Sequence, residues 1–322
     1  MTPDSRENES LSEADRKNVL SIFFTLVDEK FFSSIEKLMC SVSAEQANIA
    51  KTFISNLNSA ITLASIPFLM ASNAIKAGRY DRVYIAEALG TMKLESGDTR
   101  PKNPDEKRAR LEADRKFEAL LKTAEFRQSV TEATLKYLVV MLGNADLHRS
   151  ANELLRQVAV MTWGAIEVAV TDAVTCVVNE TPELASKLQA SEVTKKYLPM
   201  KIVSIDTLAE YEFNLSRQMG SFLFSERRMD SVPIIRDVLS TIFPQAKELH
   251  RKLRDDMLWL LCQRRHLIVH HRGVVDKAYL SKTPDKLAIG SQIQINSDDI
   301  AAYLTLARDI FENLLIALAK KR

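Results

Sequence analysis

The scarcity of glycine and proline is the feature that most constrains the fold of this chain. Its 322 residues include only eight glycines and nine prolines, and residues 4–66 contain neither. A domain made of β-strands needs many turns, which these two residue types usually supply, whereas long helices do without them. The composition therefore predicts an all-α protein.

Apolar side chains recur at helical spacing along most of the chain. The pattern that includes Val19 and Phe23 predicts helical structure from about residue 12 to 76, and a second run covers residues 82–93. The apolar stretch Ser59–Ile75 is short for a membrane span, so it predicts a core helix that is kinked or interrupted at Pro67. The polar start of the chain does not resemble a signal peptide.

Changes in composition predict three parts: a disordered N-terminus (residues 1–11), a helical N-terminal region of unknown function (12–143) and a helical bundle (150–322). Residues 94–116 are rich in turn-forming and charged residues and are expected to form a linker or solvated arm. In the bundle, Ser150 and Glu153 form a capping-box pattern that predicts a helix start. Short helices (182–240), a longer helix (245–269), a small hairpin or extended loop, and a last helix (298–321) capped by Asn296 or Ser297 are expected to follow.

Charge and cysteine content limit the possible locations and partners. The formal net charge is only +2, so the whole molecule has no general affinity for polyanions and a nucleic-acid site must be a local patch. The three cysteines are far apart and form no CxxC spacing. We therefore expect reduced thiols, a cytoplasmic location, no membrane association, no metal and no other cofactor.

The stretch Gln263–Gly273, QRRHLIVHHRG, holds three of the five histidines beside three arginines. Residues 245–272 carry seven cationic and three acidic side chains, a local net charge of +4. Histidine transfers protons near neutral pH, and the arginine fork matches the non-bridging oxygens of a phosphodiester. We therefore expect an RNA-binding surface here, with Arg264 and Arg272 among its contact residues.

The placement of these side chains on a helix leaves several arrangements open. Arg264 falls within an apolar stripe that contains Leu249, Leu253 and Leu261, so either the stripe ends there or Arg264 has a partner. Arg265 and His270 would lie about 140° apart on an ideal helix. They can meet one ligand if Arg265 reaches around, if the helix ends at the histidines, or if a second copy contributes across a two-fold axis.

Two other interpretations compete with a phosphodiester site. His266 and His270 have the separation of the two histidines in the HExxH zinc motif, but no glutamate lies between them and only Asp276 is near as a third ligand. Alternatively, the arginines and histidines form a polar cluster at a helix C-terminus, where the helix dipole favours cations.

The sequence from Arg265 to His270, RHLIVH, resembles the R-x4-6-H motif of the HEPN superfamily (higher eukaryotes and prokaryotes nucleotide-binding). The residue after the arginine is commonly polar in that motif, as His266 is. The longer stretches RRHLIVHHRGVVDKAYL and GSQIQINSDDIAAYL are similar to the bacterial branch related to the RiboL-PSP and Apea-like groups. The helix with Trp163 and Glu167 resembles the first core helix of that branch, so the resemblance covers about residues 150–322.

The resemblance implies a helical bundle that forms a homodimer with a composite, metal-independent endoribonuclease site. It places Arg265 on the scissile phosphate, His270 in proton transfer, His266 in the orienting polar position and Glu167 in a supporting acidic role; His271 directly follows His270 and is the alternative histidine. It also implies a toxin-type or anti-phage defence role, with an antitoxin or defence-system partner. Some HEPN-like domains instead bind RNA, nucleotides or proteins without cutting, and in that alternative the N-terminal helices carry the function.

Overall fold

The computed structural model describes residues 11–24, 28, 30–92, 105–198, 204–225 and 229–321. These residues form α-helices joined by loops, with one isolated antiparallel bridge between Val274 and Gln292 and no strand, which confirms the all-α prediction. Residues 1–10 of the expected disordered terminus and 94–104 of the expected linker lie outside the described residues. The chain divides into two compact units: unit 1 is residues 1–25 and 64–151, and unit 2 is residues 26–63 and 152–322.

Unit 1 is a small helical assembly with an apolar core. Val19, Phe23, Ala71, Leu135 and Leu138 pack together as buried side chains, with Leu135 and Leu138 on one helix and the others from different parts of the chain. Its helices are α1 (Glu13–Ile22), α4 (Glu106–Leu121), α5 (Ala124–Met141), the part of α3 (Ala44–Thr91) from residue 64 onward and the start of α6 (Ala145–Glu180).

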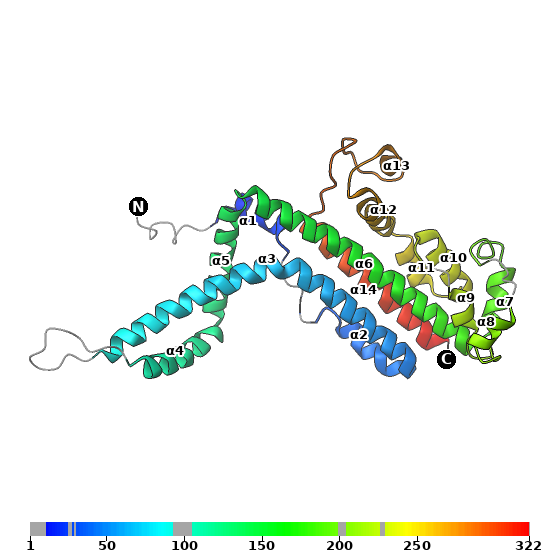
Figure 1. Ribbon diagram of the computed structural model, residues 1–322, viewed down its shortest axis with the longest axis horizontal. Coiled ribbons are helices and arrows are strands. Elements are labelled where there is room, and N and C mark those ends of the chain that lie inside the picture. The colour runs from blue at the N-terminus through cyan, green and yellow to red at the C-terminus, as the bar shows by residue number, and fades with distance from the viewer. Residues whose placement is uncertain are drawn as a thin grey trace, which may run out of the picture. The chain divides into compact units, whose positions relative to one another are not determined.

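Unit 2 is a helical bundle built on α6, α14 (Ser297–Lys320) and the N-terminal part of α3, which lie side by side (Figure 1). Phe53 of α3 stacks on Phe311 of α14 with ring centroids 4.2 Å apart. Trp163 of α6 and Tyr303 of α14 are fully buried. The capping box of Asn296 and Asp299 starts α14, which confirms the first of the two predicted caps.

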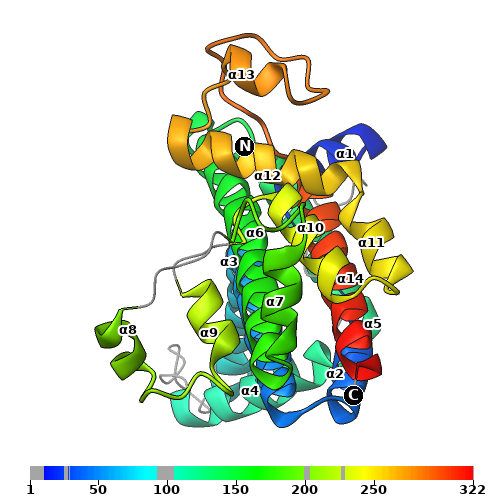
Figure 2. The same ribbon diagram turned by 90° about the vertical axis from the view of Figure 1, so that its right-hand side faces the viewer.

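The shorter helices of unit 2 surround this bundle, and α12 runs across α14 and α6 rather than along them (Figure 2). The short helices expected after residue 182 are present. The remaining elements are α2 (Ser33–Leu38), the 3-10 helix η2 (Met39–Ser41), α7 (Glu183–Ala190), α8 (Ile205–Glu210), α9 (Met219–Phe224), α10 (Val232–Ile242), α11 (Lys247–Leu253), α12 (Asp256–His271) and α13 (Lys277–Leu280).

The single helix predicted over residues 245–269 is wrong, because the chain breaks between α11 and α12. The side chain of Asp255 accepts the N–H of Met257 (2.9 Å) and so caps a new helix. The Leu253 carbonyl, which the break leaves without a helical donor, accepts a hydrogen bond from Arg236. A charged side chain from α10 thus stabilises an interruption that the apolar periodicity does not reveal.

The other predicted boundaries also need correction. The helix expected to start at Ser150 starts at Ala145, because Asn144 Oδ1 accepts the N–H groups of Asp146 (2.9 Å) and Leu147 (3.2 Å). The helix expected to end near residue 76 continues through Pro67 to Thr91, and the earlier part of that run is interrupted between α1 and α2. Unit 2 consists of residues 26–63 and 152–322, so it includes a segment that lies outside the predicted 150–322 bundle.

Two helices, α3 and α6, contain an 18-residue stretch that is long and apolar enough to cross a membrane. In α6, 56% of that stretch is buried inside the protein, and in α3 the share is 33%. Core helices of water-soluble proteins have the same length and composition. Neither helix by itself therefore indicates a membrane location.

Candidate functional site

The last turns of α12 present the histidine-rich stretch at the surface of unit 2. The helix ends where Arg272 takes the left-handed conformation (φ 53°) and Gly273 follows with φ 74°. The Gly273 N–H donates to the Leu267 carbonyl (3.0 Å), which closes the helix end. A side chain at Gly273 would be strained by this backbone and would meet Ile293 and Arg156 at 3.4 and 3.6 Å.

The structure brings the three histidines together. The ring centroids of His266 and His270 lie 4.6 Å apart, and those of His266 and His271 lie 6.0 Å apart. All three side chains are exposed, as is Arg272. The cluster is therefore open to solvent and to a ligand from one side of α12.

Arg265 is partly exposed and lies on a different part of the helix surface from His270. Within the described chain no hydrogen bond or ion pair joins the two side chains. Four residues of helix lie between them, so they point about 140° apart around the helix axis. The helix ends at His271, directly after His270, so it does end at the histidines, but Arg265 and His270 both still lie within α12.

Electrostatic surroundings keep part of the histidine cluster neutral. Partial desolvation lowers the pKa of His266, and the nearby His270, His271, Lys282 and Arg265 lower it further. Nδ1 of His271 lies 3.6 Å from the Asp276 carboxylate. His266 is therefore expected to be a neutral hydrogen-bonding group near pH 7, which suits an orienting role.

Arg264 is buried, with 8% of its surface exposed, and its guanidinium is surrounded by internal partners. It donates to the Tyr303 hydroxyl (2.7 Å) and pairs with Asp285 (3.3 Å) and Asp299 (3.2 Å). Burial opposes its charge, but Tyr303, Asp299 and Asp285 outweigh burial and raise the pKa of Arg264. This confirms the alternative in which Arg264 has a partner, and it leaves the expected RNA contact of Arg264 without a free guanidinium.

The burial of Arg264 also distinguishes the two arginines that could take the arginine position of the R-x4-6-H pattern. Both Arg264 and Arg265 precede His270 at a spacing that the R-x4-6-H pattern allows. Of the two, Arg264 is buried and Arg265 is partly exposed. Arg265 is therefore the arginine of the motif that a ligand can reach.

Glu167 lies on α6, partly exposed, on the side of unit 2 that faces Cys262 of α12. Burial raises the pKa of the Cys262 thiol, Arg265 lowers it and Glu167 raises it, so both side chains lie within electrostatic range of that sulfur. Glu167 and Arg265 are thus near the same buried group, although no direct contact joins them in the described residues.

Arg156 is a residue of the site region that the sequence did not single out. It is buried in α6, pairs with Glu153, and its guanidinium lies 3.5 Å from the Ile293 carbonyl. Its side chain also packs against Gly273, beside the histidine cluster. The sequence signal that could have identified Arg156 is a cation within the apolar stretch of α6. Its contact with Ile293 could not be predicted, because it depends on the tertiary fold.

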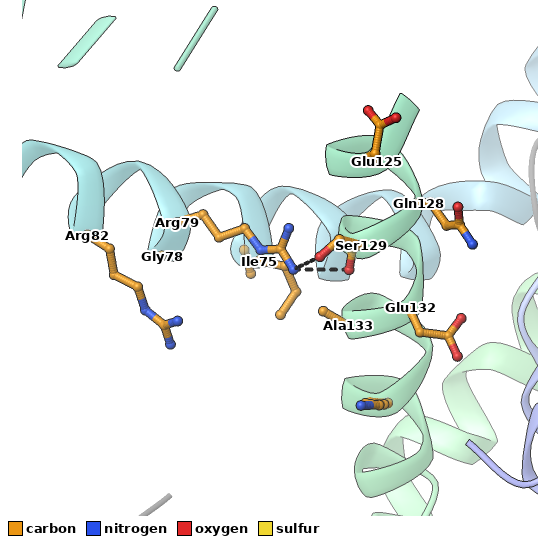
Figure 3. A pocket seen from close by; sticks show the side chains of 11 residues that line it. Ile75, Gly78, Arg79, Arg82, Glu125, Gln128, Ser129, Glu132 and Ala133 are labelled. Carbon is orange, nitrogen blue, oxygen red and sulfur yellow. Dashed lines mark hydrogen bonds between the residues drawn. The ribbon is translucent and has the colours of Figure 1, made fainter. Parts of the chain in front are cut away.

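A hollow of about 740 Å³ lies between α3 and α5 in unit 1 (Figure 3). Arg79 points across it and donates to the Ser129 carbonyl (3.0 Å) and hydroxyl (2.8 Å). Glu125 and Glu132 lie on the same wall, and Glu132 also pairs with Arg16. Because its charges are mixed and Arg79 is held by the protein, this hollow is a weaker site for an anion than the surface of α12.

The described side chains best placed to bind a metal ion lie on α3 and α6, away from the histidines of α12. Among the described residues, ligand atoms of Glu45, Cys176 and Glu180 lie within 4.8 Å of one another. Burial and the two carboxylates raise the pKa of Cys176 to about 12, which disfavours the thiolate that binds metals. Glu180 also accepts hydrogen bonds from Gln46 and Cys176. These bonds account for the trio as part of the contact between α3 and α6.

Comparisons with known proteins do not assign a function to this chain. No protein-family model, curated protein or solved structure matches this chain.

Proposed function

We propose that this protein is a metal-independent endoribonuclease of the HEPN type. The observation that supports it is the partly exposed Arg265 with the exposed His266 and His270, in the order R-H-x3-H on the final turns of one helix of an all-α bundle. A cytoplasmic location and a toxin-type or anti-phage defence role, with an antitoxin or defence partner, belong to the same proposal.

The reaction uses the 2′-hydroxyl of RNA as the nucleophile. Its oxygen forms a bond to the adjacent phosphorus while the bond from phosphorus to the 5′-oxygen breaks, which leaves a 2′,3′-cyclic phosphate and a 5′-hydroxyl. One proton leaves the 2′-oxygen and one is added to the 5′-oxygen, and His270 performs one of these transfers. Arg265 binds the non-bridging oxygens and stabilises the charge that develops on them.

A second copy of the chain would complete this site. Because Arg265 and His270 face different directions on one helix, a single copy does not aim both at one phosphate. A two-fold axis beside α12 would place the Arg265 of one copy near the His270 of the other. We therefore propose a homodimer with one composite cleft.

The test compares purified wild-type protein with the Arg265→Ala and His270→Ala variants on a 5′-labelled single-stranded RNA. Each substitution is expected to lower the cleavage rate by at least about 100-fold, because each removes a group that acts on the reacting atoms. His148→Ala is the matched control, since His148 is exposed in unit 1. Cleavage should persist in EDTA.

Mixing the two inactive variants tests the composite cleft. In a mixed dimer one chain supplies His270 and the other supplies Arg265, so a fraction of the activity should return. Unchanged cleavage by either single variant contradicts the assignment of that residue. Loss of wild-type cleavage in EDTA supports the metal interpretation, and a monomeric protein that cleaves RNA refutes the composite cleft.

The alternative is a non-catalytic RNA-binding or protein-interaction module. The observation in its favour is that His266 and His270 contact each other, whereas Arg265 and His270 do not. Such a protein would bind RNA without cutting it, and expression of wild-type and His270→Ala proteins would be equally harmless to cells.

A further inference from the structure

Three exposed lysines lie on the connection between α12 and α14 (residues 272–296). Lys277, Lys282 and Lys286 form no ion pair within the described part of the chain. The two acidic residues of this connection have other partners: Asp276 faces His271, and Asp285 pairs with the buried Arg264. The connection therefore presents uncompensated positive charge to solvent.

The backbone that carries these lysines is held in place. Trp259 Nε1 of α12 donates to the Lys282 carbonyl (2.8 Å). At the base of the connection, Val275 donates to the Ser291 carbonyl and Gly290 donates to the Val275 carbonyl, both at 2.8 Å. Because these hydrogen bonds already order the segment, its backbone loses little conformational entropy when a ligand binds there.

Lys282 and the helix α13, which contains Lys277, lie close to the histidine cluster. Partial desolvation lowers the pKa of His266, and Lys282 is close enough to lower it further. Figures 1 and 2 show α13, which contains Lys277, next to the end of α12. An extended anion that passes the histidines would therefore continue along the connection.

We propose that Lys277, Lys282 and Lys286 bind consecutive backbone phosphates of single-stranded RNA next to the cleavage site. This inference rests on the proposed function, because it supplies the path of the strand on one side of the scissile linkage. Lysine is a flexible point charge that binds phosphate without reading base sequence. The contact would therefore give affinity and position without sequence preference.

RNA fits this surface better than an acidic protein does. A stable protein interface has an apolar centre surrounded by a polar rim. In the described part of the connection, the large apolar side chains that are exposed are Val274 and Ile289, and both lie near its base, where Gly290 donates to the Val275 carbonyl. A strand of phosphates needs no apolar centre and repeats its charge along its length.

The experiment measures binding separately from cleavage. The probe is a fluorescein-labelled 12-nucleotide oligouridylate with 2′-O-methyl sugars, which has no free 2′-hydroxyl to attack the phosphate. Its affinity is measured by fluorescence anisotropy from 50 to 200 mM KCl for wild type and for Lys277→Gln/Lys282→Gln/Lys286→Gln. The matched control is Lys37→Gln/Lys51→Gln/Lys187→Gln, which removes the same charge from exposed positions in unit 2.

Each phosphate contact contributes about 0.7 to the slope of log affinity against log salt for a single strand. The triple variant in the connection should therefore lose about two units of slope, so wild-type affinity falls about 20-fold more than the variant's over this salt range. The control triple should keep the wild-type slope. Circular dichroism confirms that all variants are folded.

An unchanged slope in the triple variant of the connection overturns this inference, and the proposed nuclease stands if Arg265→Ala and His270→Ala still lose cleavage. A wild-type protein that does not bind the probe at 50 mM KCl also overturns it. If that protein fails to cleave RNA as well, the proposed function falls with it. Competition by polyglutamate as strong as by RNA would show instead that the surface binds an acidic protein.

Discussion

Two adjacent arginines of α12 lie in opposite environments. Arg264 is buried among Asp285, Asp299 and Tyr303, whereas Arg265 is partly open to solvent. The spacing of Arg264 within an apolar stripe predicted that it would need a partner. It did not predict which residues are the partners. Asp285 lies on the connection and Asp299 on α14, and both approach Arg264 only in the folded chain. The structural role of Arg264 and the proposed catalytic role of Arg265 are therefore separable by mutation.

Arg264→Met should lower the free energy of unfolding by about 3 kcal/mol, because it leaves Asp285 and Asp299 without their cation in a mostly buried position. Arg265→Met, the matched change one residue later, should alter stability by less than about 0.5 kcal/mol. Urea denaturation followed by circular dichroism measures both. Equal stability losses in the two variants would contradict the division of roles.

The ends of α12 decide which side chains reach the candidate site. Asp255 fixes where the helix starts, and the left-handed turn at Arg272 and Gly273 fixes where it stops. Gly273 lies against Arg156 of α6 and Ile293 of the connection, so the turn also holds the site region to the bundle.

Replacement of glycine by alanine should have opposite effects at two positions of unit 2. Gly273→Ala should destabilise the protein by about 1–2 kcal/mol, because alanine disfavours φ 74° and Ile293 is 3.4 Å from the new methyl group. Gly164→Ala, inside α6 with nothing within 4 Å, should stabilise by about 0.5–1 kcal/mol. Thermal unfolding of both variants measures the difference, and destabilisation by both would refute the argument.

Helix interiors were predictable from apolar spacing, but several helix ends were not. The cap of α14 was visible because Asn296 directly precedes the periodic run. The break before α12 was not, because apolar residues continue across it and its stabilising partner, Arg236, is distant in sequence. Ser150 matched a capping pattern, yet Asn144 caps the same helix further upstream. Local pattern thus identifies candidate caps, and tertiary contacts select among them.

At the scale of the whole molecule, unit 2 is discontinuous in sequence. Residues 26–63 join the unit formed by residues 152–322, and residues 64–151 belong to unit 1. Sequence alone assigned residues 26–63 to the N-terminal region, because nothing local marks Phe53 as a partner of Phe311. The candidate site was easier to predict, since its histidines are close in sequence on one helix.

The stacking of Phe53 on Phe311 predicts that an N-terminal residue supports the C-terminal bundle. Phe53→Ala should lower the free energy of unfolding of unit 2 by about 3–5 kcal/mol, because it leaves a cavity among buried helices. Phe213→Ala, at a side chain that is 66% exposed, serves as the control and should change stability little. Guanidinium titration monitored by tryptophan fluorescence reports on unit 2, which contains Trp163 and Trp259. An intact transition in the Phe53 variant would exclude this segment from the unit.

Two identical neighbours on a helix create an ambiguity that the protein has to resolve. If α12 slipped by one position, Arg265 would enter the acidic pocket in place of Arg264 and the internal ion pairs would be kept. The same slip would rotate His266 and His270 by about 100° around the helix axis. The N-cap does not oppose it, because Asp256 would take the place of Asp255. The Gly273 turn does oppose it, because the slip would put Val274 at φ 74°, which a β-branched residue rarely adopts. Specificity for one orientation of the histidines thus comes from the C-terminal turn of the helix rather than from the charge pairing itself.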